Sequence, residues 1–175
     1  MMNSGQLRTV LRQHLECRAI FVDVFAADEH PREVRLRRPC CYVVNTDVAS
    51  EPGEHWVVCY FNKEPTPGEY FDSFGKPPPR VSLKRFLGKR FKSNKRVIQA
   101  SFSTVCGQYV LIYILLKSRG YSMNEILDKF KYRRKEDNDR AVVRMVQREF
   151  GISLPVMDMR FIKRQILHEL STKHY

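Results

Sequence analysis

Apolar side chains recur along the chain at two spacings, one typical of helices and the other of strands. Residues 6–16 carry them at every third or fourth position, which predicts an amphipathic helix. Its inner face would consist of Leu7, Val10, Leu11 and Leu15. Residues 139–150 repeat the helical spacing and predict a second amphipathic helix, which would end at Gly151. The inner face of this second helix would consist of Ala141, Val142, Met145 and Val146.

Short runs rich in β-branched and aromatic side chains predict the strands. They lie near residues 21–25, 41–45, 55–61 and 69–75. Nearly every position in 55–61 is apolar, so we expect both faces of that strand to be buried, in the centre of a sheet. A shorter apolar stretch over residues 97–99 predicts an edge strand.

The longest apolar run, residues 109–116, predicts a buried helix that begins at Cys106 and ends before Gly120. Ser122 and Glu125 have the spacing of a capping box, which predicts the start of another helix. Two further helices are predicted over residues 81–87 and 159–170.

These elements predict a single α+β domain over residues 1–175, without internal repeats. We expect a central mixed or antiparallel sheet packed on the helix that begins at Cys106, with flanking helices. Residues 121–175 would form a carboxy-terminal helical part of the same domain.

The composition, 43% hydrophobic and 29% charged residues, is typical of a globular chain. The cysteines are odd in number and include no CxxC pair, which favours a reducing, intracellular compartment over a disulfide framework. No run is long enough for a membrane span. Histidines and cysteines lack the spacing of a metal site, so we expect no metal and no cofactor.

The net charge of +12 favours an acidic partner, with nucleic acid as the leading candidate. Residues 80–96 contain eight basic side chains and no acidic one. These are Arg80, Lys84, Arg85, Lys89, Arg90, Lys92, Lys95 and Arg96. They could bind nucleic acid, or they could form an ordinary solvated face.

Cys106 is the candidate nucleophile. Unpaired N–H groups and the partial positive charge at the start of a helix favour a thiolate there over a thiol. The alternative is a small buried cysteine that only packs the helix start. Gln99, seven residues earlier, could donate a hydrogen bond to an oxyanion together with the Cys106 backbone N–H.

A cysteine nucleophile also needs a base and a group that orients the base. His55, at the start of an apolar strand, and Asp72, seventeen residues later, could fill these two roles. A symmetric turn centred near Pro65 would pair Asp72 with Val58, about 10 Å along the strand from His55. The sequence leaves open whether the register brings the carboxylate to the imidazole.

These residues resemble the adenovirus endopeptidase (adenain) family of cysteine proteases. The similar blocks are residues 41–46 with His55-Trp56 after a nine-residue step, residues 70–75 around Asp72, and Gln99 with Cys106-Gly107. The amino-terminal helix and the stretch 28–31 are similar as well, so the resemblance covers roughly residues 6–120. Adenoviral members have Glu where this chain has Asp72. The segment 106–109 looks most like the proteases of Polinton/Maverick transposons and virophages.

The resemblance implies a cysteine endopeptidase that matures capsid or precursor proteins at small-residue sites. His55, Asp72, Cys106 and Gln99 would carry the catalysis. It also implies possible activation by DNA or a short peptide, and we expect a monomer in the host cytoplasm or nucleus or packaged in the virion. Two alternatives remain open: an isopeptidase that acts on SUMO or ubiquitin-like modifiers, and a basic nucleic-acid-binding module without catalysis.

Overall fold

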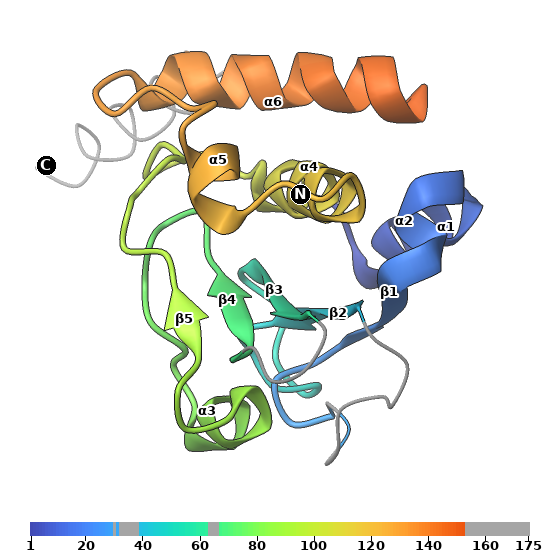
Figure 1. Cartoon of the computed structure of the whole chain (residues 1–175), viewed down its shortest axis with the longest axis vertical. Coiled ribbons are helices and arrows are strands. Elements are labelled where there is room, and N and C mark those ends of the chain that lie inside the picture. The colour runs from blue at the N-terminus through green and yellow to red at the C-terminus, as the bar shows by residue number, and fades with distance from the viewer. Residues whose placement is uncertain (30, 32–38, 63–66, 153–175) are drawn as a thin grey trace, which may run out of the picture.

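The computed structural model describes residues 1–29, 31, 39–62 and 67–152, and a mixed five-stranded sheet runs through its middle (Figure 1). The strands are β1 (Phe21–Phe25), β2 (Cys40–Asn45), β3 (Trp56–Phe61), β4 (Glu69–Phe71) and β5 (Lys92–Ser93), in this spatial order. The β2–β3 and β3–β4 pairs are antiparallel, and the outer pairs β1–β2 and β4–β5 are parallel. The predicted α+β class with a mixed sheet is therefore confirmed, with β3 in the centre.

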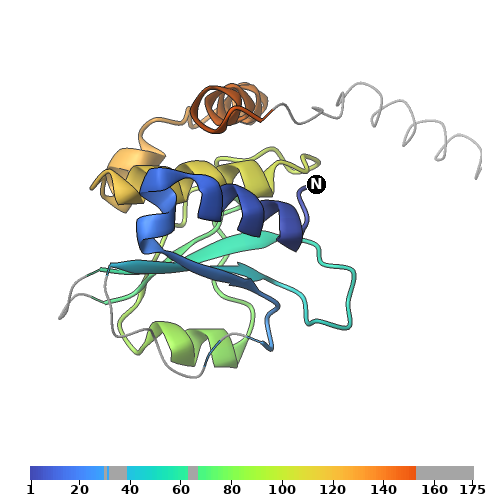
Figure 2. The ribbon, with the colours of Figure 1, turned by 90° about the vertical axis from the view of Figure 1, so that its right-hand side faces the viewer.

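Helices cover both faces of this sheet (Figure 2). They are α1 (Ser4–Gln13), α2 (Leu15–Ile20), α3 (Val81–Leu87), α4 (Cys106–Ser118), α5 (Met123–Leu127) and α6 (Lys135–Phe150). The helices α1, α2 and α4 lie on one face, α6 forms an outer layer over α4, and α3 lies on the opposite face.

The sheet is apolar on both sides because each side has its own core. Alternate side chains of β3 point to opposite faces, as the pleat requires. Trp56, Val58 and Tyr60 belong to the larger core beneath α4. Val57, Cys59 and Phe61 belong to the smaller core over α3. This division explains why the strand has a continuous apolar run instead of an alternating pattern.

The helix α4 is the most buried element, as its unbroken apolar run predicts. Every residue from Cys106 to Lys117 is buried, between the sheet below and α6 above (Figure 1). The ring of Phe71 in β4 stacks on Tyr113 with centroids 4.1 Å apart, which joins helix and sheet. Gly120 follows the helix with a φ of +87°, a backbone angle that other residues adopt at a cost.

The first predicted helix is in fact two helices, so its continuation beyond residue 13 is wrong. His14 adopts an extended conformation, and its Nδ1 accepts a hydrogen bond from the backbone N–H of Cys17 in α2. Leu7 and Leu11 are buried as predicted, whereas the side chain of Leu15 is 69% exposed. Helical spacing alone could not reveal a break at which a histidine caps the next helix.

The predicted edge strand at residues 97–99 is also wrong. The strand β5 lies earlier, at Lys92–Ser93. The backbone N–H groups of Ile98 and Gln99 both donate to the carbonyl of Ser73, at 2.9 and 3.1 Å, so the chain turns there instead of pairing along its length. This turn carries Gln99 toward the start of α4.

The carboxy-terminal predictions have mixed outcomes. The capping box of Ser122 and Glu125 is present at the start of α5. The helix predicted over 139–150 begins earlier, at Lys135, and the helix predicted over 159–170 lies outside the described residues. The extent of the domain over residues 1–175 stays a prediction. Within the described ranges, we find no helix with the length and apolar character to span a membrane.

Candidate active site

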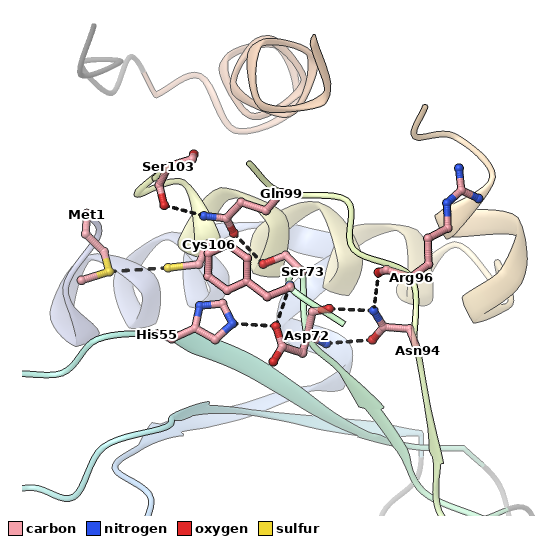
Figure 3. A network of polar contacts seen from close by, with 10 residues as sticks. Met1, His55, Asp72, Ser73, Asn94, Arg96, Gln99, Ser103 and Cys106 are labelled. Carbon is pink, nitrogen blue, oxygen red and sulfur yellow. Dashed lines mark hydrogen bonds and ion pairs between the residues drawn. The ribbon is translucent and has the colours of Figure 1, made fainter. Parts of the chain in front are cut away.

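His55 and Asp72 meet at the end of the sheet that faces the start of α4. His55 lies directly before β3, and its Nε2 is 2.8 Å from Oδ1 of Asp72, which follows β4 (Figure 3). Val58 pairs with Phe71 in the β3–β4 ladder, so the predicted pairing of Asp72 with Val58 is wrong by one residue. This shift places Asp72 one position nearer His55, and the carboxylate reaches the ring.

The carboxylate of Asp72 is oriented by its own surroundings. The backbone N–H of Asp72 donates to Oδ1 of Asn94 at 2.9 Å. Nδ2 of Asn94 donates in turn to the backbone carbonyl of Asp72 at 2.6 Å. The backbone N–H of Phe74 donates to Asp72 Oδ1 at 2.7 Å. The Phe74 ring lies 4.7 Å from the His55 ring, centroid to centroid. Carboxylate and imidazole are therefore held from several sides.

The electrostatics of this pair favour a protonated imidazole. Burial lowers the pKa of His55, but the hydrogen bond to Asp72 and the neighbouring Cys106 sulfur outweigh burial and raise it from 6.5 to about 9. Because Nε2 contacts a carboxylate oxygen, it carries a proton. Nδ1 is buried without a hydrogen-bond partner, and it lies on the side of the ring toward Cys106 (Figure 3).

Cys106 is the first residue of α4, and it is 2% exposed. Its sulfur sits at the positive end of a 13-residue helix. The Sγ lies 3.5 Å from Sδ of Met1, which reaches the site from the amino terminus. Burial raises the pKa of the thiols of Cys17, Cys41 and Cys59, to about 12 for Cys17. Those three cysteines are packing residues at neutral pH.

The side chain of Gln99 is fully buried and held at both ends. Nε2 donates to the backbone carbonyl of Ser103 at 2.7 Å, and Oε1 accepts from the hydroxyl of Ser73 at 2.6 Å. Because a carbonyl can only accept, these contacts fix the orientation of the amide. Figure 3 places the amide beside Cys106. One N–H of Nε2 is used by Ser103, and the second is available to another acceptor.

The structure thus brings His55, Asp72, Gln99 and Cys106 together, and their catalytic roles stay predictions. The sequence analysis missed the residues that hold them. Two of these supporting residues are Ser73 and Asn94. Both lie in segments that the sequence indicated only as ordinary turns and loops. Contacts separated by 22 and 26 residues in the chain leave no periodic pattern from which they could be read.

The first turns of α6 form a second support that the sequence analysis missed. Nδ2 of Asn138 donates to the carbonyl of Ile98 at 3.0 Å. The backbone N–H of Ala100 donates to Oδ2 of Asp139 at 3.4 Å. Ile98 and Ala100 flank Gln99, so hydrogen bonds from α6 hold the backbone on both sides of Gln99. Burial raises the pKa of Asp139, although its hydrogen bonds oppose the effect.

The eight basic residues of 80–96 lie along a segment that begins at α3, on the sheet face opposite α4, and continues through β5 toward α5 (Figure 1). Two of them have partners within the fold: Arg80 lies 3.6 Å from Glu51, and Arg96 bonds to Asp128 at 3.2 Å and to the carbonyl of Phe130. The other six are exposed, namely Lys84, Arg85, Lys89, Arg90, Lys92 and Lys95. Of these, Lys84 and Arg85 belong to α3, so the sheet separates these two from Cys106 (Figure 2).

Metal ligation has no candidate among residues 1–29, 31, 39–62 and 67–152. No group of three or more His, Cys, Asp or Glu side chains in these ranges could hold a metal ion.

Comparisons with known proteins give a limited set of similarities. No protein-family model and no curated protein matches the chain. Two crystal structures of the ASFV pS273R protease are similar to it. The selenomethionine form is 25% identical, with a TM-score of 0.44, over 60% of this chain and 44% of that chain. The other is 19% identical, with a TM-score of 0.48, over 77% and 64%. The chain therefore spans less than two thirds of the length of either structure.

Proposed function

We propose that this chain is a cysteine endopeptidase with Cys106 as its nucleophile. The observation that carries the proposal is the arrangement around His55. One ring nitrogen contacts Asp72 at 2.8 Å, and the other, without a hydrogen-bond partner, faces the Cys106 sulfur (Figure 3). A nucleophile, a base and an orienting carboxylate in this order are the parts that thiol proteases need.

In the proposed reaction the Cys106 thiolate attacks the carbonyl carbon of the scissile peptide bond and forms a tetrahedral intermediate. The His55 imidazolium then gives its Nδ1 proton to the leaving amine as the C–N bond breaks, which leaves a thioester on Cys106. The neutral imidazole next takes a proton from water, whose oxygen attacks the thioester and releases the acid. Asp72 keeps the ring oriented in both steps. Each proton and bond is supplied by the chain, the peptide or water.

The negative oxygen of each tetrahedral intermediate needs donors that are already in place. The backbone N–H at the start of α4 is one, because the first N–H groups of a helix lack intrahelical partners. The second N–H of Gln99 Nε2 is the other, since Ser103 uses only the first. Loss of one such donor in a protease costs about 2.7–4 kcal/mol of transition-state stabilisation.

For the substrate, we propose capsid or precursor proteins of a virus or transposon, cleaved inside the host cell or in the virion. The support is the resemblance of the His55, Asp72 and Cys106 blocks to adenain-type proteases, with Polinton and virophage enzymes as the nearest type. The alternative is an isopeptidase on SUMO or ubiquitin-like modifiers, which would use the same four side chains.

A substrate panel tests this proposal and separates it from the isopeptidase alternative. One arm contains internally quenched peptides with Gly-containing sites, and the other contains SUMO and ubiquitin with a fluorogenic carboxy-terminal amide. We expect cleavage of the peptides, little turnover of the modifiers, and no cleavage by Cys106→Ala. Faster turnover of the modifiers would favour the isopeptidase. Equal peptide cleavage by Cys106→Ala would contradict a role for this thiol.

A second candidate function, nucleic-acid binding, is supported by the six exposed cations of residues 80–96. Because α3, which carries Lys84 and Arg85, lies across the sheet from α4, DNA could bind at that helix without covering the catalytic face (Figure 2). Each phosphate that these cations neutralise would steepen the salt dependence of binding by about 0.9 in log–log slope. We expect the variant with Lys84→Glu and Arg85→Glu to reduce that slope, and Arg144→Glu, an exposed cation of α6, to leave it nearly unchanged. Binding that does not depend on salt would contradict this function.

A further inference from the structure

A cavity of about 450 Å³ lies beside the proposed nucleophile. Two of its lining residues border the catalytic groups directly. Met1 lines it and has its sulfur 3.5 Å from Cys106 Sγ. Trp56 lines it as well and follows His55 in the chain. A peptide with its scissile carbonyl at Cys106 would lie next to Met1, which borders the cavity.

The wall of the cavity is acidic, although the protein as a whole carries a charge of +12. Glu29, Asp47 and Glu51 contribute carboxylates. The segments that surround them, residues 19–29, 31 and 39–62, contain no Lys or Arg among the described residues. The four arginines between these segments, at positions 32, 35, 37 and 38, lie outside the described residues.

Arg8 is the one cationic side chain of the lining, and it is engaged elsewhere; Met1, which carries the amino-terminal group, lines the cavity as well. Nε of Arg8 donates to Asp23 at 2.5 Å, and its terminal nitrogen donates to the carbonyl of Val24 at 3.0 Å. Glu51 is partly engaged, since Arg80 lies 3.6 Å away. Asp47 and Glu29, by contrast, have no ion-pair partner within the described part of the chain. Two carboxylates of the cavity are therefore available to a cation from outside.

A buried amide provides an independent sign of a ligand. Asn45 lines the cavity, pairs with Trp56 across β2 and β3, and is 6% exposed. Its Oδ1 accepts from the backbone N–H of Asp47 at 2.9 Å. Its Nδ2 has no hydrogen-bond partner among the described residues. A carbonyl group of a bound peptide could accept a hydrogen bond from this free donor on a largely buried side chain.

We propose that this cavity binds a segment of the substrate that carries a Lys or Arg side chain close to the scissile bond. The basic side chain would lie between Asp47 and Glu29, and Asn45 would donate to a backbone carbonyl of the same segment. This inference rests on the proposed protease function, because only the contact between Met1 and Cys106 relates the cavity to a scissile bond. It adds a charge preference to the small-residue sites that the resemblance implies.

Matched peptides test the preference directly. In a cleaved peptide, each of the four positions on either side of the scissile bond is occupied in turn by Lys, Gln or Glu, and kcat/KM is measured. We expect one or two adjacent positions at which the peptide with Lys has a kcat/KM about tenfold above that of the peptide with Glu. At a partly exposed site the cavity carboxylates attract the Lys side chain and repel the Glu side chain. The ratio should fall as salt rises from about 50 mM to about 500 mM, because salt screens exposed charges.

Variants assign the preference to the cavity. The double variant Asp47→Asn with Glu29→Gln should reduce the Lys/Glu ratio to about threefold or less. Because the ratio is taken within one variant, a general loss of activity cancels. Glu54→Gln, an exposed acid of the same loop outside the cavity wall, should keep the ratio of the wild type. Thermal melting checks that each variant is folded.

Two results would overturn the inference: equal rates for Lys, Gln and Glu at every position, or a preference that survives in the double variant. Failure of the protease function itself looks different. In that case no peptide of the panel is cleaved, and a peptide vinyl sulfone fails to label Cys106. Cleavage without charge preference therefore refutes the cavity assignment alone.

Discussion

The hydroxyl of Ser73 donates a hydrogen bond to Oε1 of Gln99 at 2.6 Å, and this contact helps to set which end of the amide faces Cys106. The preceding residue, Asp72, contacts the imidazole of His55 at 2.8 Å. The two residues that leave β4 therefore hold the two groups that flank the proposed nucleophile. A substitution at Asp72 or Ser73 should therefore lower catalytic activity strongly even where it changes the stability of the fold only a little.

Replacement of Ser73 by Ala tests this arrangement. We expect kcat to fall about three- to tenfold with little change in KM, since a lost hydrogen bond of about 0.5–1.5 kcal/mol loosens Gln99. Alkylation of Cys106 by iodoacetamide should keep its rate, because that reaction develops no oxyanion. Ser101→Ala, at an exposed serine of the same loop, is the matched control. An equal loss of rate in peptide cleavage and in alkylation by iodoacetamide would indicate a general disturbance of the site and would contradict a specific effect on Gln99.

Asp72→Asn should lower the pKa of His55. In the wild type, burial lowers this pKa, and Asp72 and Cys106 outweigh burial to raise it to about 9. Removal of the carboxylate charge leaves the burial effect less opposed. NMR titration of the histidine ring signals measures the change. A pKa that stays near 9 in the variant would show that Asp72 is not the main partner of the ring.

The same pKa predicts a pH dependence of stability. A pKa that is higher in the folded than in the unfolded protein means that protonated His55 stabilises the fold. This contribution is fully present below about pH 6.5 and is lost as pH rises through about 9. Urea unfolding at pH 6 and pH 9 should therefore show a larger decrease in unfolding free energy for the wild type than for Asp72→Asn. Equal decreases would contradict the assignment.

Gly107 should tolerate Ala poorly, although helix interiors normally favour that change. It is the second residue of α4, and an added Cβ would lie 2.9 Å from Cβ of Met2. Met2 is buried, and its carbonyl accepts from the indole N–H of Trp56 at 2.8 Å. We expect a loss of about 1–3 kcal/mol and a red shift in the emission of Trp56, which is the single Trp of the chain.

Gly5 is a matched control for that change, because it is the second residue of α1. The nearest atom to its added Cβ is Oδ1 of Asn3 at 3.4 Å, an ordinary contact. Gly5→Ala should therefore stabilise the protein by about 0.5–1 kcal/mol without a change in Trp56 emission. Similar effects of Ala at both positions would contradict tight packing between Met2 and Gly107.

Asn138→Ala should destabilise the fold by about 2–4 kcal/mol, because it leaves buried backbone groups without partners. The side chain donates to the carbonyls of Ile98 and Lys131 at 3.0 and 2.8 Å, and it accepts from the N–H of Lys131 at 2.8 Å. Chemical denaturation measures the loss. Asn124→Ala, at an exposed residue of α5, should cost far less. A loss below about 0.5 kcal/mol for Asn138→Ala would contradict the contacts described.

Much of the fold was predictable because its elements are apolar in regular patterns. The continuous run of β3 indicated a strand buried on both faces, and the run after Cys106 indicated a buried helix. Both signals come from burial within one segment, which a sequence displays directly. The break at His14 depends on one side-chain contact, and the turn at Gln99 depends on two backbone hydrogen bonds to Ser73, so no periodicity revealed them.

The candidate site was predictable only in part. The sequence offered His55, Asp72, Gln99 and Cys106 as the groups that thiol chemistry needs. It did not settle the ladder register, and the structure differs from a symmetric hairpin by one residue. The supports Asn94, Asn138 and Asp139 act across long separations in the chain, where only the packing of α6 and the loop after β5 brings partners together. The acidic cavity likewise arises from segments that meet only in the fold.

The central claim is that Cys106 is a nucleophile activated by His55, and covalent labelling tests it most directly. A peptide vinyl sulfone is incubated with the wild type, Cys106→Ala and His55→Ala, and mass spectrometry locates the adduct. The account predicts rapid labelling of the wild type at Cys106, none at this position in Cys106→Ala, and strongly slowed labelling in His55→Ala. Equal labelling of all three proteins, or an adduct at another cysteine, would contradict it.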